Sequence, residues 1–565
     1  MDCQNSRLDP PSPAHSVPLA QVAVHLHPLD NVAIAKVELP AGITLLLGDR
    51  ADVPSPGRLR LRQTIPSGHK VALQPIAAGE PVLRYGQEIG LATKAIRPGE
   101  HVHIHNLGVE ALEARRAHGV RVVQSGVRVV ETDVRVVQSD VRVVESGVRT
   151  PVAAEVRPLS SQPQGERQTF LGYKRPDGRA GTRNYIAVIS TVNCSAHVTR
   201  AIASHFTPER LASFSHVDGV VAFTHHLGCT YRVGSRDHLL LQRTLAGIAR
   251  HPNVGAYLLV GLGCETNQID DLAQRCELCI PEGRGLVIQE LGGIRKTVEA
   301  GIVAVEELLP EVNQARRSPQ PVSELVVALQ CGGSDGWSGV TANPAAGLVS
   351  DELVRQGGTV VLAETPEIYG AEHLLVRRAA SPEVGAKLMA QVRWWQEHAR
   401  RQGMDVDDNR SVGNAAGGLT TIYEKSLGAV AKAGSTPLME VYDYAEPVAA
   451  RGFVFMNSPG YDPVSVTGQV AGGCNLVLFT TGRGSVCGFK PAPVIKIASN
   501  SATYGCMVDD MDLNAGRVLE GAPMAQVAGE LLDITAAVAS GQPSKSEVQD
   551  VGEAEFVPWQ TVGVL

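Results

Sequence analysis

Short apolar runs separated by helix-like stretches dominate the chain from about residue 168 onward. The runs are YIAVIST (185–191), GVVAF (219–223), AYLLVG (256–261), GLVIQE (285–290), LVVALQ (325–330) and TVVLAE (359–364). Between several of them lie patterns with helical spacing, such as RDHLLLQRTLAGIARH and IRKTVEAGIVAVEELL. Strands buried on both faces have this composition, and right-handed helical crossovers connect them in parallel. The pattern predicts an α/β fold with a mostly parallel sheet.

Polar and thiol side chains follow many of these predicted strands. In open parallel sheets, ligands bind beyond the carboxyl ends of the strands. The residues at those ends are Asn193, Cys194, His225, His226, Cys264, Glu265, Glu290, Cys331 and Glu364. Their accumulation at one kind of position predicts a functional site.

The rest of the chain divides into a β domain and a linker. Residues 1–117 contain short alternating strands punctuated by Gly and Pro-Gly, as in IPSGHKVAL, and predict a small β domain. Residues 118–167 contain four copies of a VRVV-type heptad. Its valines are poor helix formers and it carries no Leu, so a low-complexity linker is preferred to a coiled coil. We predict α/β regions over 168–430 and 431–565.

Composition and charge exclude several classes of partner. The net charge is −7 without a long basic block, and aromatic residues make up 4% of the chain, so nothing indicates nucleic-acid binding. No apolar stretch reaches the length of a membrane span, and the N-terminus lacks a signal-peptide pattern. We therefore expect a cytoplasmic protein with reduced cysteines, and a homodimer as the commonest closed assembly.

The segment HVHIHN carries His101, His103 and His105 at alternate positions. If the segment is a strand, the three imidazoles share one face and can chelate Fe, Mn or Zn. An exposed histidine-rich face without a ligand is the alternative. His27, Asp30, His69 and Lys70 lie in turns nearby and are candidate catalytic residues, although loop side chains of these types are often only solvated.

The loop QCGGSDGWSGVTANPAAG (330–347) is the candidate substrate-binding segment. We expect Asn343 to cap a helix that begins at Pro344, because a helix N-terminus attracts carboxylates. A second loop cluster lies further along the chain, where Arg483 offers a bidentate grip on a carboxylate. The predicted substrate-binding residues are Ser334, Asp335, Ser338, Thr341, Asn343, Arg483, Ser485, Lys496 and Asn500.

The cysteines allow two interpretations. Cys276 and Cys279 form a CxxC without a second pair, so a structural zinc is not indicated. Five others offer ligands for iron or an iron–sulfur cluster, although buried free cysteines more often act as small hydrophobic residues. These five are Cys194, Cys229, Cys264, Cys331 and Cys474.

Several stretches together resemble the altronate and galactarate dehydratase family, and its altronate branch most. They are HPLDNVAIA, IPSGHKVAL, YGQEIGLATKAIRPGEHVHIHN, GYKRPDGRAGTRNYIAVIS, QCGGSDGWSGVTANPAAG, GGLTTIYEKSLG, PGYDPVSVTGQVAGGCNLVLFTTGRGS and KIASN. The resemblance implies an N-terminal β-clip domain of the antifreeze-like, or SAF, type, followed by a large α/β catalytic region. It also implies dependence on a divalent metal, Fe²⁺ with Mn²⁺ as the alternative. An iron–sulfur cluster is the weaker option, because it needs three of the cysteines to converge.

The implied reaction is the metal-dependent dehydration of D-altronate to 2-dehydro-3-deoxy-D-gluconate in hexuronate catabolism. A base removes the C2 proton while a Lewis acid stabilises the carboxylate, and a general acid assists departure of the C3 hydroxyl. His27, Asp30, His69 and Lys70 are offered as acid or base, and His103 and His105 as metal ligands. Galactarate, another aldonate or sulfolactate are the alternative substrates, and a sugar-acid binding protein is the non-enzymatic alternative.

Overall fold

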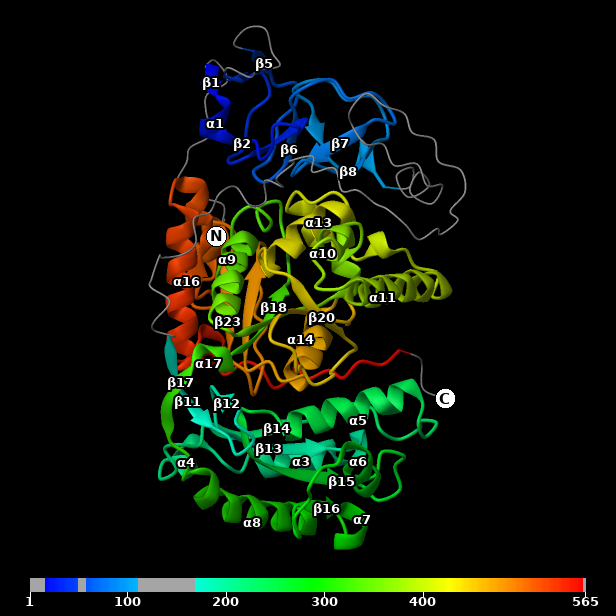
Figure 1. The fold of residues 1–565 in the computed structure, drawn as a ribbon, viewed down its shortest axis with the longest axis vertical. Helices are drawn as coiled ribbons and strands as arrows, with labels where there is room; N and C mark the ends of the chain where they lie inside the picture. Colours follow the sequence, from blue (N-terminus) through cyan, green and yellow to red (C-terminus); the bar gives the residue numbers. More distant parts are fainter. Residues whose placement is uncertain (1–15, 49–56, 110–167, 562–565) are drawn as a thin grey trace. The chain divides into compact units, whose positions relative to one another are not determined.

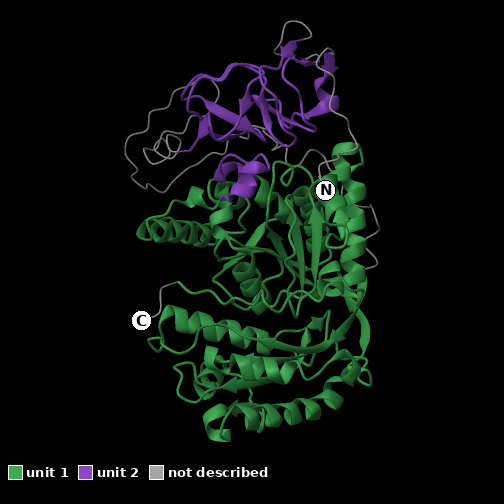
Figure 2. Cartoon of the chain, turned by 180° about the vertical axis from the view of Figure 1, so that it is seen from behind, with its two compact units in different colours: residues 1–4, 157–409, 428–565 green, residues 5–156, 410–427 purple. Residues whose placement is uncertain are grey.

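The computed structural model describes residues 16–48, 57–109 and 168–561 (Figure 1). The predicted linker at 118–167 and its repeat lie outside the described residues. The chain forms two compact units, which Figure 2 distinguishes by colour. Unit 1 comprises residues 1–4, 157–409 and 428–565, and unit 2 comprises residues 5–156 and 410–427.

Unit 2 contains three small β-sheets built from short strands. Their strand orders are β1-β4-β5, β10-β8-β7 and β2-β3-β6-β9. A hydrophobic core in this unit includes Ala33, Leu39, Ile43, Leu45 and Val71, all fully buried. The elements are β1 (Ser16–Pro18), α1 (Leu19–Val22), β2 (Ala23–Val24), β3 (Val32–Ala35), β4 (Thr44–Leu46), β5 (Arg58–Arg60), β6 (Lys70–Ala72), β7 (Pro81–Arg84), β8 (Gln87–Ala92), β9 (His101–Val102) and β10 (Leu107–Gly108).

A segment from much later in the sequence completes unit 2. Residues 410–427 contain α12 (Val412–Ala416) and the beginning of α13 (Ile422–Ala429). The Thr421 hydroxyl donates to the Ile89 carbonyl at 2.5 Å. Gly418 has φ +97°, and a Cβ there would lie 2.2 Å from the Gly68 carbonyl oxygen, so only glycine permits this approach.

The first part of unit 1 is a four-stranded parallel sheet of order β14-β13-β15-β16. Alternate residues of β13 face opposite layers: Ile186 and Val188 pack with α3 and α8, whereas Ala187 and Ile189 pack with α5. The elements are β13 (Tyr185–Ser190), η2 (Asn193–Ser195), α3 (Ala196–Ala203), α4 (Pro208–Leu211), β14 (Gly219–Phe223), α5 (Arg236–Ala249), β15 (Val254–Gly261), α6 (Ile269–Cys276), β16 (Gly285–Val287), α7 (Ile288–Leu291) and α8 (Ile294–Val312).

The second part of unit 1 is a seven-stranded parallel sheet of order β20-β21-β19-β18-β22-β23-β24. Its strands are β18 (Val326–Cys331), β19 (Thr359–Leu362), β20 (Leu438–Tyr442), β21 (Gly452–Met456), β22 (Leu476–Thr481), β23 (Val494–Ala498) and β24 (Leu513–Asn514). An antiparallel sheet joins β11 (Thr169–Lys174) to β12 (Ala180–Gly181) and β17 (Arg317–Pro321).

Helices and 3₁₀ turns connect these strands, and α9 and α16 pack against one another. The helices are α9 (Ala342–Arg355), α10 (Glu372–Val376), α11 (Pro382–Arg401), α14 (Asp462–Ala471), α15 (Ser501–Cys506), α16 (Met524–Ala539) and α17 (Lys545–Val548). The 3₁₀ turns are η3 (Val322–Glu324), η4 (Thr365–Ile368), η5 (Val406–Asp408), η6 (Val430–Ala433) and η7 (Ala515–Glu520). No helix in the described ranges combines the length and apolarity that crossing a bilayer requires.

Buried polar side chains link the two parallel sheets within unit 1. His251 is fully buried and donates from Nε2 to the Cys474 carbonyl at 2.9 Å, while its Nδ1 accepts from the Asn253 amide at 3.0 Å. The Asn253 side chain donates to the carbonyls of Asn475 and Pro491 at 3.2 and 3.0 Å. Because His251 already serves as both donor and acceptor, it must be neutral, and burial lowers its pKa to about 3.

The predicted fold class is confirmed, and the six apolar runs contain the strands β13, β14, β15, β16, β18 and β19. Two local predictions are wrong. Glu290 lies in α7, because β16 ends at Val287. Asn343 does not cap a helix, because α9 begins at Ala342 after Thr341. The predicted boundary between residues 430 and 431 falls inside η6.

Candidate functional site

Three imidazoles meet in unit 2 and form the first candidate metal centre. His69, His101 and His103 each offer a ring nitrogen, and these atoms all lie within 4.8 Å of one another. Nδ1 of His69 is 3.0 Å from Nε2 of His101, and the other His69 nitrogen donates to the Ala416 carbonyl at 3.2 Å. A carbonyl partner of this kind fixes the tautomer of a metal-binding histidine.

The electrostatics of the imidazole group favour neutral rings. Burial and the neighbouring His69 lower the pKa of His101 to about 3, and burial together with Lys70 lowers the pKa of His103 to about 4. Nδ1 of His103 is buried and has no hydrogen-bond partner among the described residues. Neutral imidazoles with an available lone pair are what a divalent cation such as Fe²⁺ needs, so the group fits the implied metal.

The histidines do not form the strand face expected from their spacing. β9 ends at Val102, and a turn follows in which the Asn106 side chain accepts from the His103 amide at 2.9 Å. His105 is exposed in that turn, with its ring 5.5 Å from that of His101. His69, which the sequence offered only as an acid or base, joins the group in place of His105.

Beside His69, Lys70 is fully buried in an ionic network. Its ammonium donates to both carboxylate oxygens of Glu424 at 2.8 and 2.9 Å and to the Gly418 carbonyl at 2.7 Å. Arg84 forms a second ion pair with the same carboxylate. Burial lowers the pKa of Lys70 to about 8, whereas the two cations outweigh burial and hold the pKa of Glu424 well below its ordinary value.

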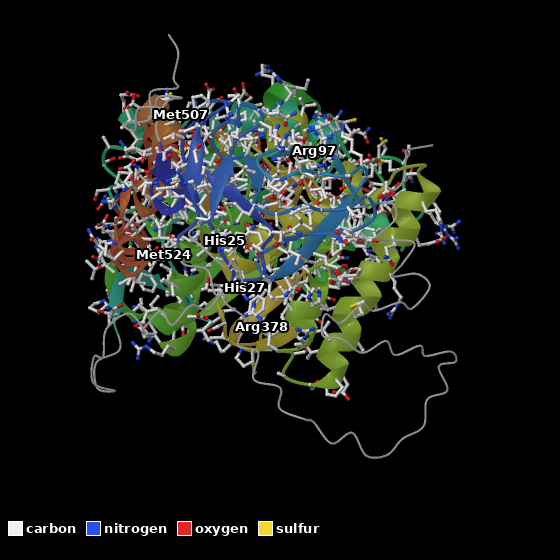
Figure 3. All side chains as sticks on the ribbon, turned by 90° about the horizontal axis from the view of Figure 1, so that it is seen from above. His25, His27, Arg97, Arg378, Met507 and Met524 are labelled. Carbon is white, nitrogen blue, oxygen red and sulfur yellow. The ribbon has the colours of Figure 1, made fainter. Side chains whose placement is uncertain are left out.

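His27 and Asp30 shape a turn in the same unit, and His27 is labelled beside His25 in Figure 3. Asp30 is buried and accepts from the backbone amides of His27, Tyr85 and Gly86 at 3.1, 3.1 and 2.7 Å. Burial raises its pKa. Nδ1 of His27 accepts from the Leu29 amide at 3.0 Å, so Nε2 carries the proton. Asp30 therefore holds backbone in place, whereas His27 presents a donor.

The glycine-rich loop after β18 is organised around a buried carboxylate. Asp335 accepts from the hydroxyls of Ser338 and Ser499 at 2.9 and 2.8 Å, and from the Asn500 amide at 3.0 Å. Gly482 is required beside it, because a Cβ there would lie 2.2 Å from the Asp335 carboxyl carbon. Burial raises the pKa of Asp335, and the hydrogen bonds oppose that rise.

The other residues of this predicted substrate loop are also buried. Thr341 donates to the Ser499 carbonyl at 2.6 Å, and Asn343 accepts from the Thr480 hydroxyl at 2.6 Å. Ser334 is buried as well. The Asp335 and Ser338 side chains thus bond within the loop, whereas Thr341 and Asn343 tie it to the ends of β23 and β22.

Of the four other predicted binding residues, Lys496 lies on β23, Arg483 and Ser485 follow β22, and Asn500 follows β23. Arg483 is exposed, and Ser485 accepts from the Cys487 amide at 3.2 Å. Asn500 caps α15 while it holds Asp335. Lys496 is fully buried on β23, its ammonium has no hydrogen-bond partner in the described part of the chain, and burial lowers its pKa.

A second metal-capable group lies in unit 1, beyond the ends of β18 and β19. Cys331, Glu364 and Glu367 are all buried, and their ligand atoms lie within 4.8 Å of one another. The thiol donates to Glu367 at 3.2 Å and accepts from the Lys432 ammonium at 2.7 Å. Burial and Glu367 raise the pKa of Cys331 to about 12, so it is a thiol, whereas the pKa of Lys432 is raised by these neighbours despite its burial.

Glu364 in this group has a left-handed backbone, with φ +69°. A non-glycine residue in that region carries strain that is commonest at functional positions. The Glu364 backbone amide donates a hydrogen bond to the Ser458 hydroxyl at 3.0 Å. The strained, buried carboxylate marks the carboxyl edge of the seven-stranded sheet as a second candidate site.

Four charged residues beside the two candidate metal groups were not predicted from the sequence, namely Arg84, Glu367, Glu424 and Lys432. Glu367 follows β19 by only a few residues, so the strand-end argument that singled out Glu364 extends to it. Glu424 stands inside GGLTTIYEKSLG, one of the stretches behind the family resemblance. Arg84 and Lys432 gave no local signal, because only the fold brings them to their partners.

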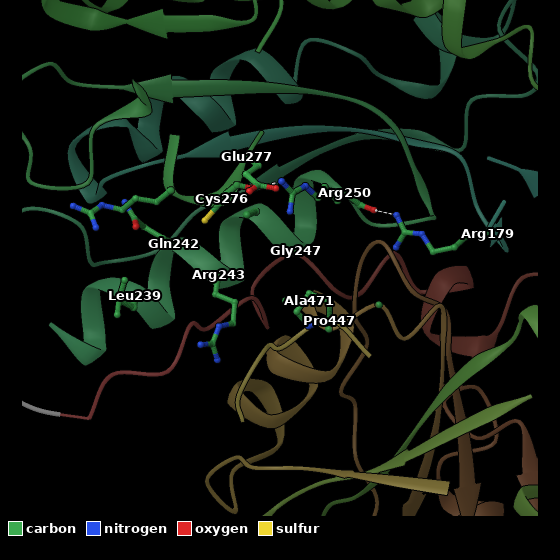
Figure 4. A pocket seen from close by; sticks show the side chains of 14 residues that line it. Arg179, Leu239, Gln242, Arg243, Gly247, Arg250, Cys276, Glu277, Pro447 and Ala471 are labelled. Carbon is green, nitrogen blue, oxygen red and sulfur yellow. Dashed lines mark hydrogen bonds between the residues drawn. The ribbon is translucent and has the colours of Figure 1, made fainter. Parts of the chain in front are cut away.

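A pocket of about 560 Å³ lies elsewhere in unit 1 (Figure 4). Its lining includes Arg179, Arg243, Arg250 and Arg275, but none of the residues of the two candidate metal groups. Arg179 and Arg275 are hydrogen-bonded to Asp177 and Asp271, and the other two donate to backbone carbonyls. None of the predicted catalytic residues lines this pocket, so it is not the predicted active site.

Comparisons with known proteins cover almost the whole described chain. Residues 21–110 match the altronate/galactarate dehydratase SAF domain, 172–313 the second domain of D-galactarate dehydratase/altronate hydrolase, and 322–564 the C-terminal domain of D-galactarate/altronate dehydratase. The altronate dehydratases of Escherichia coli K12 and Bacillus subtilis 168 are 33% and 32% identical over 94% of this chain and 97% of theirs. The galactarate dehydratase (L-threo-forming) of Escherichia coli K12 is 35% identical over 92% of this chain and 93% of its own. The chain therefore belongs to the altronate/galactarate dehydratase family of sugar-acid dehydratases.

Proposed function

We propose that this protein is a metal-dependent hydro-lyase that converts D-altronate to 2-dehydro-3-deoxy-D-gluconate. The observation that carries the metal dependence is the group of three imidazoles, His69, His101 and His103, with ligand atoms within 4.8 Å of one another. The similarity to two altronate dehydratases supports the substrate, and the equally close galactarate dehydratase supplies the alternative.

The imidazole group would hold Fe²⁺ or Mn²⁺ with coordination positions left open for oxygen donors. A metal bound there supplies Lewis acidity, which makes the substrate carboxylate a better electron sink and so acidifies the C2 proton. The buried cations Lys70 and Arg84 add positive potential in the same unit, which favours an anionic substrate.

The hydrogen bonds of the candidate acid and base residues indicate which of them can donate a proton. His27 presents Nε2–H, because the Leu29 amide occupies its Nδ1, so it fits the general acid that assists the departing C3 hydroxyl. Asp30 is bonded to three backbone amides, and Lys70 donates to three acceptors. We therefore assign Asp30 and Lys70 to positioning, and the base that removes the C2 proton is left unassigned.

The test is an anaerobic assay of the purified protein with D-altronate, with and without Fe²⁺, following 2-keto-3-deoxy acid formation. Iron-dependent product is expected. His103→Ala should lose both bound metal and turnover, because it removes a ligand whose Nδ1 has no other partner. Turnover of galactarate alone would change the substrate and keep the mechanism.

Two variants separate the candidate metal groups. Glu367→Gln alters the unit 1 group, whereas His101→Ala alters the imidazole group. If Glu367→Gln abolishes metal binding and His101→Ala does not, the assignment of the metal to unit 2 is wrong. A folded protein that binds the acids without turning them over would indicate a binding protein. The homodimer predicted from the sequence is part of the proposal, and light scattering would test it.

A further inference from the structure

Three exposed cysteines follow three adjacent strands of the four-stranded parallel sheet in unit 1. Cys194 follows β13, Cys229 follows β14 and Cys264 follows β15, and these strands are neighbours in the order β14-β13-β15. The carboxyl ends of parallel strands meet at one edge of a sheet, where ligands bind. The topology therefore brings three thiols to one ligand-binding edge, outside both candidate metal groups.

Backbone hydrogen bonds tie the three cysteine loops together. The Asn193 amide donates to the Leu227 carbonyl at 2.9 Å, which joins the loop of Cys194 to that of Cys229. The amide and hydroxyl of Thr266 both donate to the Cys229 carbonyl, at 3.3 and 2.6 Å, which joins the loop of Cys264 to that of Cys229. Each outer loop is thus bonded within two residues of the central cysteine.

A buried polar scaffold fixes these loops from beneath. Glu265 accepts from the Thr191 hydroxyl at 2.9 Å and from the amides of Leu262 and Gly263 at 2.9 and 2.6 Å. The Asn267 side chain donates to the Thr191 carbonyl at 2.9 Å. Thr191, Glu265 and Asn267 are all buried, so the polar groups inside the loops bond to one another while the cysteines face outward.

The spacing of the thiols is too wide for a single ion. Zinc–sulfur bonds of about 2.3 Å hold tetrahedral ligand sulfurs about 3.8 Å apart. Among the described residues, the groups whose ligand atoms all lie within 4.8 Å of one another do not include these cysteines. In a [4Fe–4S] cluster each cysteine binds a different iron, so the ligand sulfurs lie farther apart than around one ion.

We propose that Cys194, Cys229 and Cys264 bind a [4Fe–4S] cluster whose fourth iron has no cysteine ligand and takes an oxygen donor. The three thiols lose their protons on binding, and sulfide with ferrous and ferric iron in equal amounts supplies the cluster, so no further oxidant is needed. The Gln289 amide donates to the Cys264 sulfur at 3.5 Å, the type of contact that tunes cluster sulfurs. The cluster itself does not depend on the proposed function; only the identity of the oxygen donor, a hydroxy acid, rests on it.

The test is anaerobic reconstitution of the full chain with sulfide and equal amounts of ferrous and ferric iron, followed by assay of iron and acid-labile sulfide. After a chelator wash that removes exchangeable iron from the imidazole group, the wild-type chain should keep about four of each, with a broad visible absorption that dithionite bleaches. Cys194→Ser, Cys229→Ser and Cys264→Ser should each lose at least half of the sulfide. All three side chains are exposed, so these variants should keep the wild-type melting temperature.

The matched control is the Cys276→Ser/Cys279→Ser double variant. This pair lies at the other end of α6, and the Cys279 carbonyl accepts from Tyr257, near the start of β15 rather than its end. The control should keep the full sulfide content. Zinc or iron retained without sulfide after the chelator wash, or equal sulfide in all four variants, would overturn the proposal. His103→Ala should keep the sulfide, so failure of the imidazole site is distinguishable from failure of the cluster.

Discussion

The ionic network around Glu424 makes an asymmetric prediction about stability. Glu424 forms ion pairs with two buried cations, Lys70 and Arg84, and all three side chains are at most 1% exposed. Glu424→Gln keeps the shape but leaves two cations without the carboxylate. Removing one partner of a buried pair costs about 3–5 kcal/mol, because the charge left behind is not compensated.

Lys70→Met should cost less than Glu424→Gln. The Arg84–Glu424 pair survives that change, and the main loss is the hydrogen bond to the Gly418 carbonyl. Leaving a buried carbonyl unsatisfied costs about 1–3 kcal/mol. In the double variant only one of the two cations paired with Glu424 is left uncompensated, so the two changes together should cost less than their sum.

Hydrogen–deuterium exchange of peptides covering β6, β7 and residues 412–427 measures this locally. A loss of about 3–5 kcal/mol corresponds to exchange roughly 150- to 5,000-fold faster. The control is Glu440→Gln, which breaks the exposed Lys387–Glu440 pair and should change exchange in its own peptide by less than about 1 kcal/mol. If Lys70→Met accelerates exchange as much as Glu424→Gln, the assignment of Glu424 as the shared counter-ion is wrong.

Three further predictions concern pH, packing and metal. The pKa of His251, about 3 when folded, lies below its unfolded value of about 6.5, so stability falls as pH drops below about 6.5. By pH 5 the loss is about 2 kcal/mol, and urea titrations should show it in the wild type but not in His251→Gln. Gly482→Ala places a Cβ 2.2 Å from the Asp335 carboxyl carbon and should cost about 1–3 kcal/mol in the same titrations. Gly505→Ala, with open space around it, should cost less. Fe²⁺ at a hundred times its dissociation constant should stabilise the chain by about 2.7 kcal/mol in calorimetry, and a chelator should reverse this. An equal response in a His69→Ala/His103→Ala variant would contradict the imidazole site.

The parallel sheets were predictable because strands buried on both faces must be apolar throughout. The strands β13, β15 and β18 were located from such apolar runs, and their residues are almost all buried. It could not give the order of the seven-stranded sheet, since any of these runs has the composition to pair with any other. Pairing depends on helix packing and crossover connections, which leave no mark on a single strand.

The candidate site was partly predictable, for a related reason. His69 and Lys70 were singled out from a local motif, but Glu424 lies 354 residues from Lys70, and no sequence period connects them. The histidine face failed because Asn106 bonds to the His103 amide and the His101 carbonyl, which ends the strand. The Asn that directly follows HVHIH favours a turn, and the prediction from alternating histidines did not take it into account.

The two proposed sites both bind iron, but they differ in how the iron is lost and restored. An imidazole site holds one exchangeable Fe²⁺, so a chelator removes it and added metal restores it. A cluster on exposed thiolates is lost with its sulfide, and the freed cysteines become open to oxidation. Air exposure followed by iron alone should therefore restore the first site but not the second. If the dehydration depends only on the imidazoles, activity after air exposure should return with iron alone. If the open iron of the cluster binds the acid, activity should return only after reduction with iron and sulfide together.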